Sequence, residues 1–399
     1  MFRPPLSAVR MLILPLAVAF AIPALVGCRN TQSAEKAVLA PVGSLVQSWK
    51  LPLELSSQGD SIRGLYLRDD ILFAYSQNNR VVAITAATGK IIFGADVTPG
   101  SIPLKPPIVM KDRYCFPDGS SIECYDRKTG KLLDSVETER SIRSPGAQSG
   151  NTIYVGLDYP GGGRLSAIDL TRKYDRARWQ ALTFGGIASK PAVFQNVVYF
   201  GSEDGRVYAV GEDRTPVWPL EHSAFQTDGK VIGDLYADET GLYVASTDAK
   251  LYCLELGTGK IKWQYFAAAP LEDGPVVTDD TVYVTVPRVG VAVLTKTEGK
   301  YNREPRFVAK GADRFLAQDE KNVYLKSTDN YIVAYDKQSG EMKFKSERRD
   351  LIALAVNTTK DSTIYGATRD GLVLAIKPVN KPGTVGTLVA APVRAKDAG

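Results

Sequence analysis

Histidine is almost absent from this sequence of 399 residues. The single histidine, His222, lies in the segment LEHSAF, and no second histidine is present to share a metal ion. Metal centres and acid–base catalysis commonly depend on histidine, so one isolated copy predicts neither. The four cysteines are dispersed, and no two of them are adjacent. We therefore predict no catalytic residue, no metal site and no bound cofactor.

The sequence also lacks a strong charge imbalance and a long internal hydrophobic run. Lys and Arg number 49 against 44 Asp and Glu. Because nucleic-acid-binding proteins usually carry a strong basic excess, we expect no nucleic-acid partner. Beyond the N-terminus, no apolar segment approaches the roughly 20 residues of a membrane-spanning helix. We therefore expect the chain after its N-terminal segment to be soluble.

The N-terminal segment has the pattern of an export signal. Arg3 and Arg10 precede the apolar core MLILPLAVAFAIPAL, which two prolines interrupt. This core is too short to span a bilayer, as is typical of signal peptides. It ends at Leu25-Val26-Gly27-Cys28, which resembles the bacterial lipobox, whose cysteine is acylated and becomes the new N-terminus.

The lipobox resemblance implies how the start of the chain is divided. Residues 1–27 would form a lipoprotein signal peptide, Cys28 would carry the lipid, and residues 28–43 would form a tether. Arg29, rather than an aspartate, follows the cysteine. The resemblance therefore implies an outer-membrane anchor that faces the periplasm, with the lipid chains supplying the membrane affinity.

A small residue recurs at intervals of 39 to 44 residues along the rest of the chain. An aromatic residue lies ten positions before it in most copies, and this spacing differs only before Ala167 and Ala292. A period of this size is typical of solenoids, propellers and other repeat arrays. The eight recurring positions are Ala83, Cys124, Ala167, Ala209, Cys253, Ala292, Ala334 and Ala375.

Each repeat unit has the pattern of four short strands and contains no ten-residue amphipathic helix. In residues 270–303, the segments GPVVTDD, TVYVTV and GVAVLTK alternate with Gly and Asp turns, and GKYNRE follows as the expected fourth strand. Four antiparallel strands per unit are typical of a propeller blade. The sequence therefore predicts an all-β protein, an eight-bladed β-propeller of four-stranded antiparallel blades over residues 44–380.

The two ends of the repeat region predict how the ring closes. The last unit ends in LVLAIKPVNKPG without an aromatic residue, whereas the N-terminal segment LVQSWKLPL carries Trp49 but no hairpin of its own. Ring closure removes exposed sheet edges. We therefore expect the N-terminal strand to complete blade eight and residues 381–399 to form a disordered tail.

The pattern A-x-D-x-x-T-G-K-x-x-W recurs at the end of the units and is nearly complete from Cys253 to Trp263. It resembles the tryptophan-docking repeat of pyrroloquinoline-quinone-type propellers, and the resemblance covers residues 45–378. It implies that the glycine turns the chain and that the aromatic residue holds the outer strand against the neighbouring blade. The expected docking residues are Trp49, Phe93, Trp179, Trp218, Trp263 and Phe344.

Members of that family that act as quinone-dependent dehydrogenases carry an adjacent cysteine pair, calcium-ligating acids and long loops. This chain has no adjacent cysteines and no room for an inserted loop, so we predict that it is not an enzyme.

Signal, lipobox, blade count and repeat type resemble the BamB family of outer-membrane assembly lipoproteins. The resemblance implies a monomeric, lipid-anchored scaffold for protein partners, with the barrel-assembly machinery as the implied partner. The alternatives are another envelope-binding role or a quinone-dependent dehydrogenase.

Blade three departs twice from the repeat. LDYPGGGR lengthens its central hairpin, and DLTRKYDRARW adds residues before Trp179. Departures from a repeat are places where a function can be added, and aromatic and arginine side chains are enriched at interfaces. We therefore expect a cluster of partner contacts at Tyr159, Arg172, Lys173, Tyr174, Arg176 and Arg178.

Cys115 and Cys124 lie in the hairpin YCFPDGSSIEC and face the same side of it. Their side chains are directly opposite if Gly119-Ser120 is the turn and diagonal if Asp118-Gly119 is the turn. The periplasm permits a disulfide. However, Cys124 and Cys253 occupy a position that alanine fills in other units, which favours small buried thiols.

Overall fold

The structure is a computed structural model that describes residues 38–55, 59–98, 102–218, 224–297, 299–346, 348–390 and 392–393. The predicted signal peptide, Cys28 and His222 lie outside these residues. All of the secondary-structure elements within the described ranges are β-strands. The same ranges contain no helix that is long and apolar enough to cross a bilayer.

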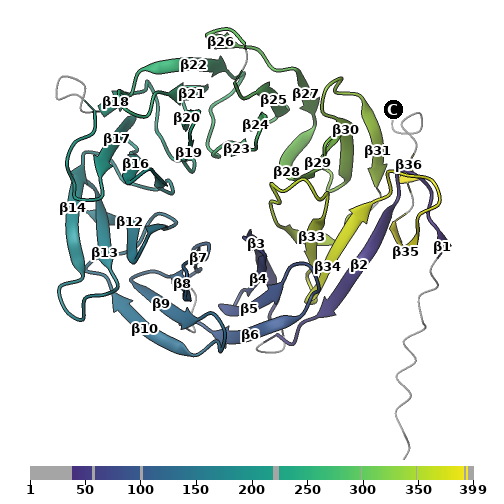
Figure 1. The fold of residues 1–399 in the computed structure, drawn as a ribbon, viewed down its shortest axis with the longest axis horizontal. Helices are drawn as coiled ribbons and strands as arrows, with labels where there is room; N and C mark the ends of the chain where they lie inside the picture. Colours follow the sequence, from purple (N-terminus) through teal and green to yellow (C-terminus); the bar gives the residue numbers. More distant parts are fainter. Residues whose placement is uncertain are drawn as a thin grey trace, which may run out of the picture. The chain divides into compact units, whose positions relative to one another are not determined.

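Eight sheets, antiparallel except for one short added strand in blade five, form the blades of one closed ring, and the first strand of each blade faces the centre (Figure 1). The first four blades have four strands each. Blade one contains β3 (Ile62–Arg68), β4 (Ile71–Ser76), β5 (Arg80–Thr85) and β6 (Ile91–Asp96). Blade two contains β7 (Ile108–Val109), β8 (Arg113–Pro117), β9 (Ser121–Asp126) and β10 (Leu132–Glu137). Blade three contains β11 (Ala147–Ser149), β12 (Thr152–Tyr159), β13 (Gly162–Asp169) and β14 (Ala177–Thr183). Blade four contains β15 (Ala192–Phe194), β16 (Val197–Gly201), β17 (Arg206–Gly211) and β18 (Ala224–Gln226).

The remaining blades follow the same plan, and three of them carry additional strands on their outer edges. Blade five contains β19 (Tyr236–Asp238), β20 (Gly241–Ser246), β21 (Lys250–Leu254), β22 (Ile261–Phe266) and the added β26 (Asn302–Arg303). Blade six contains β23 (Val276–Val277), β24 (Thr281–Val286), β25 (Gly290–Thr295) and β27 (Phe307–Lys310). Blade seven contains β28 (Ala312–Gln318), β29 (Asn322–Ser327), β30 (Ile332–Asp336), β31 (Met342–Ser346) and the added β36 (Pro392–Val393). Blade eight contains β32 (Leu351–Leu354), β33 (Ile364–Thr368), β34 (Leu372–Pro378), β2 (Leu45–Pro52) and the added β35 (Val385–Ala390) and β1 (Val38–Leu39).

The N-terminal strand closes the ring, which confirms the predicted fold. β2 pairs antiparallel with β34, and Trp49 lies opposite Ala375. Figure 1 shows the purple β2 beside the yellow β34, so the two ends of the propeller sequence share one blade. Without β2, the edge of β34 would lack a partner strand.

The prediction that residues 381–399 form a disordered tail is wrong for part of that segment. β35 pairs with both β2 and β1, and β36 pairs with β31. The segment Val385–Ala390 reads VGTLVA and is rich in strand-forming residues. It pairs because β2 presents a free edge, which the repeat pattern alone does not reveal. The end of the expected tether is also ordered, since β1 forms at Val38–Leu39 and Ala40 is buried.

The fourth strand of blade six also differs from the prediction. Asn302 and Arg303, within GKYNRE, pair in parallel with β22 of blade five. The fourth strand is β27, which begins at Phe307 and pairs with β25. The sequence pattern therefore misplaced this strand, because an edge-pairing segment is inserted before it.

Aromatic residues on the second strands meet small residues on the third strands. In six blades the aromatic ring lies directly opposite the recurring small residue, as in Phe73 with Ala83 and Tyr243 with Cys253. These side chains are fully or almost fully buried. A small residue opposite each ring leaves room for it in the core between blades. The small-residue period of the sequence therefore marks a packing requirement.

The docking aromatics contact the turn of the next blade. A Cβ atom added to Gly89 would lie 2.7 Å from the Trp49 ring, and one added to Gly259 would lie 2.8 Å from the Trp218 ring. The Trp49 indole also donates a hydrogen bond of 2.9 Å to the carbonyl oxygen of Ala86, and that of Trp218 donates one of 2.9 Å to Leu256. The glycine is required here because the ring lies directly on its backbone and because φ is positive at both glycines.

The other blade junctions repeat or modify this contact. Phe93 packs on Gly130, and Trp179 donates a hydrogen bond of 2.6 Å to the carbonyl oxygen of Glu212. Phe344 packs on Gly43. Trp263 instead lies under the guanidinium of Arg303. At the next junction, Phe307 packs on Gly340, and sequence reasoning missed this docking residue.

Cys115 and Cys124 form a disulfide, although the sequence pattern favours small buried thiols and left this pairing open. They pair directly across β8 and β9, and their Cα atoms are 4.1 Å apart. The Asp118 amide donates to the carbonyl oxygen of Ser121, so Gly119-Ser120 is the turn. Blade two therefore uses a covalent link at a position where other blades place an aromatic or small residue.

Candidate functional site

Blade two lacks the docking aromatic. Asp134 lies opposite Cys124, at the position that Phe93 occupies opposite Ala83 in blade one. Arg176, in the loop of blade three between β13 and β14, forms a two-point ion pair with the Asp134 carboxylate. The contact from Nη2 to Oδ1 is 3.1 Å long. An ion pair therefore replaces the aromatic contact between blades two and three.

This ion pair changes the role expected for Arg176. The sequence predicts that its guanidinium faces a partner, but each side chain of the pair is only 20% exposed. Bidentate pairing fixes the orientation of an arginine strongly. Arg176 therefore joins two blades and leaves its neighbours in the loop to face solvent.

A groove of about 540 Å³ lies beside the ion pair, between β10 and the loop that precedes β14. Val136, Leu157 and Ile168 line its apolar part. Acidic Glu137 and Glu139 stand on the blade-two side, across from the blade-three loop. The three apolar side chains are almost fully buried, so the groove has a small apolar floor between charged margins. Such a mixed lining suits a polypeptide segment.

The blade-three loop brings Lys173 and Tyr174 to this groove. The Tyr174 ring is 77% exposed, and the Lys173 ammonium lies 5.4 Å from its centre. Exposed tyrosine is a common interface residue, because its ring offers area and its hydroxyl offers a hydrogen bond.

Local hydrogen bonds define the shape of this loop. Asp169 accepts hydrogen bonds from the amide of Thr171 at 2.9 Å and from its hydroxyl at 2.6 Å. The hydrogen bond from the Thr171 hydroxyl is the main reason that the pKa of Asp169 lies below its ordinary value. Arg172 donates to the carbonyl oxygen of Asp175 at 3.1 Å. Arg172 therefore stabilises the loop, although its side chain remains partly exposed.

The structure does not bring all of the expected contact residues together. Tyr159 pairs with Gly162 at one end of β13, whereas Asp169, at the other end, pairs with Arg176 through the backbone. Tyr159 instead packs under Arg164, whose guanidinium carbon is 4.5 Å from the ring centre. A hairpin and the loop after its second strand necessarily lie at opposite ends of the blade. The prediction of one cluster is wrong for Tyr159. Arg178 is exposed on β14 but does not line the groove.

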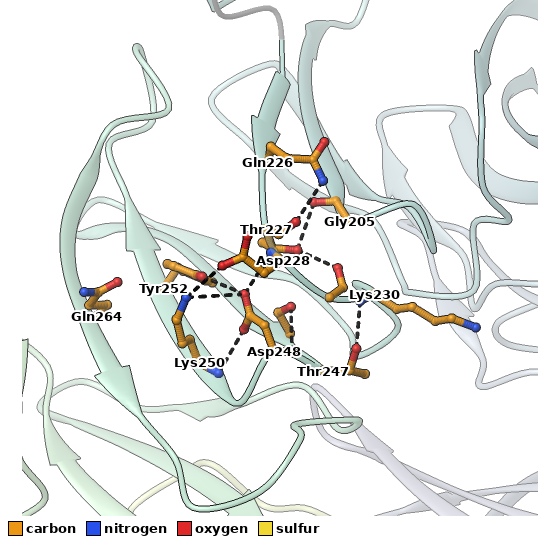
Figure 2. Close-up of polar contacts among 12 residues, drawn as sticks. Gly205, Gln226, Thr227, Asp228, Lys230, Thr247, Asp248, Lys250, Tyr252 and Gln264 are labelled. Carbon is orange, nitrogen blue, oxygen red and sulfur yellow. Dashed lines mark hydrogen bonds and ion pairs between the residues drawn. The ribbon is translucent and has the colours of Figure 1, made fainter.

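A second surface, which the sequence analysis missed, lies at the rim of blades four and five (Figure 2). Asp248 accepts hydrogen bonds from the Tyr252 hydroxyl at 2.7 Å and from the Asp228 amide at 3.1 Å. Lys250 forms an ion pair of 3.2 Å with Asp228. Burial is the main cause of the raised pKa of Tyr252, and its hydrogen bond to Asp248 adds to it. These contacts hold two neighbouring loops together.

Exposed aromatic rings flank this polar network. Phe184 is 77% exposed and packs against Arg206, which follows Gly205 in the sequence. Phe266 is 52% exposed and lies near Lys250. Sequence reasoning missed this rim because its residues come from several loops and strands that are far apart in the sequence.

Comparison with solved structures identifies the same architecture in proteins of different kinds. The crystal structure of BamB from Moraxella catarrhalis matches with a TM-score of 0.63 and 18% identity, covering 84% of this chain and 97% of that chain. The computationally designed Ika8 protein matches with a TM-score of 0.61 and 16% identity, covering 80% and 97%. The C-terminal WD40 domain of Sif2 matches with a TM-score of 0.62 and 15% identity, covering 85% and 99%. At these identities the likeness shows the fold alone.

Sequence comparison is more specific. No curated protein matches this chain. The family described as outer membrane protein assembly factor BamB matches residues 118–346, more than half of the chain and the region that contains the groove and the blade four–five rim. This chain therefore belongs to the BamB family of outer-membrane protein assembly factors.

Proposed function

We propose that this chain is a non-enzymatic scaffold that binds protein partners during the assembly of outer-membrane β-barrel proteins. Membership of the BamB family is the observation that carries the proposal. The ring offers rigid edges and loops on which a partner can dock, and its groove combines apolar and charged side chains. The proposed partner is the barrel-assembly machinery, and the ring acts as a monomer.

The proposal includes a lipid anchor at the periplasmic face of the outer membrane. The lipobox pattern at Cys28 supports it. Acyl chains would hold the ring close to the membrane in which barrels are assembled. The alternatives remain a propeller with a different envelope-binding role and a quinone-dependent dehydrogenase.

We place the partner contact at the groove between blades two and three. Lys173 and Tyr174 are the residues proposed to touch the partner, because Arg176 is held by Asp134. Glu137 and Glu139 provide the opposite charge across the groove. Arg172 and Arg178 are secondary candidates on the same loop and strand, and Tyr159 would contact a partner only at the other face.

Site-specific photo-cross-linking in cells tests this placement. A photoreactive phenylalanine replaces Tyr174 in one variant and Tyr301 in a matched control, since Tyr301 is 50% exposed on another part of the ring. We expect cross-linking from position 174, but not from position 301, to a component of the barrel-assembly machinery identified by mass spectrometry. A component captured only from a photoreactive residue at Phe184 would move the contact to the blade four–five rim. Absence of every assembly component from all three positions would contradict the scaffold role.

A further inference from the structure

The outer edge of blade eight exposes a group of apolar side chains, here termed the apolar ribbon. β1 is the outermost strand of the six-stranded sheet and lies against β35. The exposed fractions are 40% for Val38, 69% for Leu39, 53% for Val42, 65% for Val385 and 39% for Leu388. Sheet edges that face water are usually protected by charged residues or by a covering segment. The apolar ribbon instead exposes valine and leucine side chains at this edge.

Its apolar side chains lie on both faces of the two strands. Leu39 pairs with Val385, so these two share a face, while Val38 pairs with Gly386. Side chains alternate along a strand, which places Val38 and Leu388 on the other face. A partner protein that docks on one face of this sheet would leave the apolar side chains of the other face exposed to water. A lipid interface can surround a projecting ribbon on both faces.

Charge and chain length favour the same partner. Lys377, on the strand next to β2, and Lys381, just before β35, are both exposed. Such lysines suit anionic lipid headgroups at the margin of an inserted apolar segment. Val38 follows Cys28 by ten residues. A fully extended segment of that length reaches at most about 35 Å, so an acylated Cys28 would keep the ribbon near the bilayer.

We propose that the apolar ribbon inserts into the interface of the lipid bilayer and fixes the orientation of the ring on the membrane. This inference rests on the proposed lipid anchor at Cys28. The acyl chains supply the membrane affinity, and the ribbon supplies a second contact that a flexible tether alone does not provide.

Fluorescence quenching in vesicles tests the ribbon and the anchor separately. The acylated mature protein, which begins at Cys28, is placed in vesicles of phosphatidylethanolamine and phosphatidylglycerol, with brominated acyl chains as the quencher. A tryptophan is introduced by Leu39→Trp or, as a matched control, by Leu133→Trp, because Leu133 is 49% exposed on the edge strand of blade two. The signal of the added tryptophan is the difference from the parent protein.

We expect bromolipid to reduce the added Leu39→Trp signal roughly twofold or more and to leave the Leu133→Trp signal unchanged. If the protein floats with the vesicles but the two signals respond equally, the ribbon proposal fails while the anchor stands. If the acylated protein does not float, both proposals fail. The emission maximum of Leu39→Trp could instead be blue-shifted already without vesicles, with an intensity that bromolipid does not change. That result would show that protein covers the ribbon, and it would also overturn the inference.

Discussion

Asp134 and Arg176 show how a single substitution changes the joint between two blades. Phe93 holds its junction by burying a ring on a glycine, whereas Asp134 requires a cation from the next blade. A two-point ion pair needs both members, because either charge alone would be left partly desolvated. The groove described above lies beside this ion pair, and Arg176 is one of the residues that line it.

Removing either member of this pair should destabilise the ring. We expect Asp134→Ala and Arg176→Ala each to lower the free energy of unfolding by about 1–2 kcal/mol, since the pair is only partly buried. The double variant should cost less than the sum of the two, as equilibrium denaturation of all four proteins would measure. Additive effects would show that the two side chains do not stabilise each other.

The cysteines should differ sharply in reactivity. Burial is the main cause that raises the pKa of the Cys253 thiol to about 12, so little thiolate forms at pH 8. In a form that begins at residue 29, we expect no rapid alkylation while the protein is native. After denaturation without reductant, mass spectrometry should find Cys253 alone modified. Modification of Cys115 and Cys124 under that condition would contradict the disulfide.

At the scale of the elements, the turn before each outer strand determines how neighbouring blades meet. Gly259 has a φ of +71° and lies directly under the Trp218 ring. Gly257, two residues earlier in the same turn, has no atom near the position that a Cβ would occupy. Gly259 is therefore needed because the Trp218 ring packs on its backbone, whereas Gly257 reflects only the general preference for glycine in turns.

Gly259→Ala should destabilise the protein, and Gly257→Ala should not. The first variant combines the cost of positive φ with a clash against the indole, for an expected loss of about 1–3 kcal/mol. The control should stay within about 0.5 kcal/mol of the parent protein. Thermal unfolding of both variants measures the difference, and equal stabilities would refute tight docking at this junction.

At the scale of the whole molecule, stability depends on the closure of blade eight. β2 comes from the start of the propeller sequence and pairs with β34 near its end. On its other side, β2 pairs with β35. The closing strand is therefore held between two segments from the C-terminal part of the chain, which links the two ends of the protein in one sheet.

Deleting residues 29–53 should therefore lower the melting temperature far more than deleting residues 382–399. The first deletion removes β1, β2 and Trp49, and it opens the ring. The second removes β35 and β36 and exposes only outer edges. Thermal unfolding followed by circular dichroism compares the two forms. Equal melting temperatures would contradict closure by the N-terminal strand.

Much of the fold could be predicted from the sequence because it depends on local repeats. The spacing of Ala83 and its seven equivalents reflects a packing requirement that six of the eight blades share, so the blade count and strand order follow from it. The docking glycines and aromatics likewise belong to one short motif. Closure by Trp49 was predictable because an incomplete last unit needs a strand from elsewhere.

The candidate surfaces depended on contacts between distant segments. Arg176 was grouped with Tyr174 by sequence position, but the partner of Arg176 is Asp134 in another blade. Tyr159 was separated from that loop by the length of a strand. Val385–Ala390 became a strand only because β2 offers an edge to pair with. A local pattern specifies what each segment can form, whereas its partners are set by which edges and side chains the closed ring brings together.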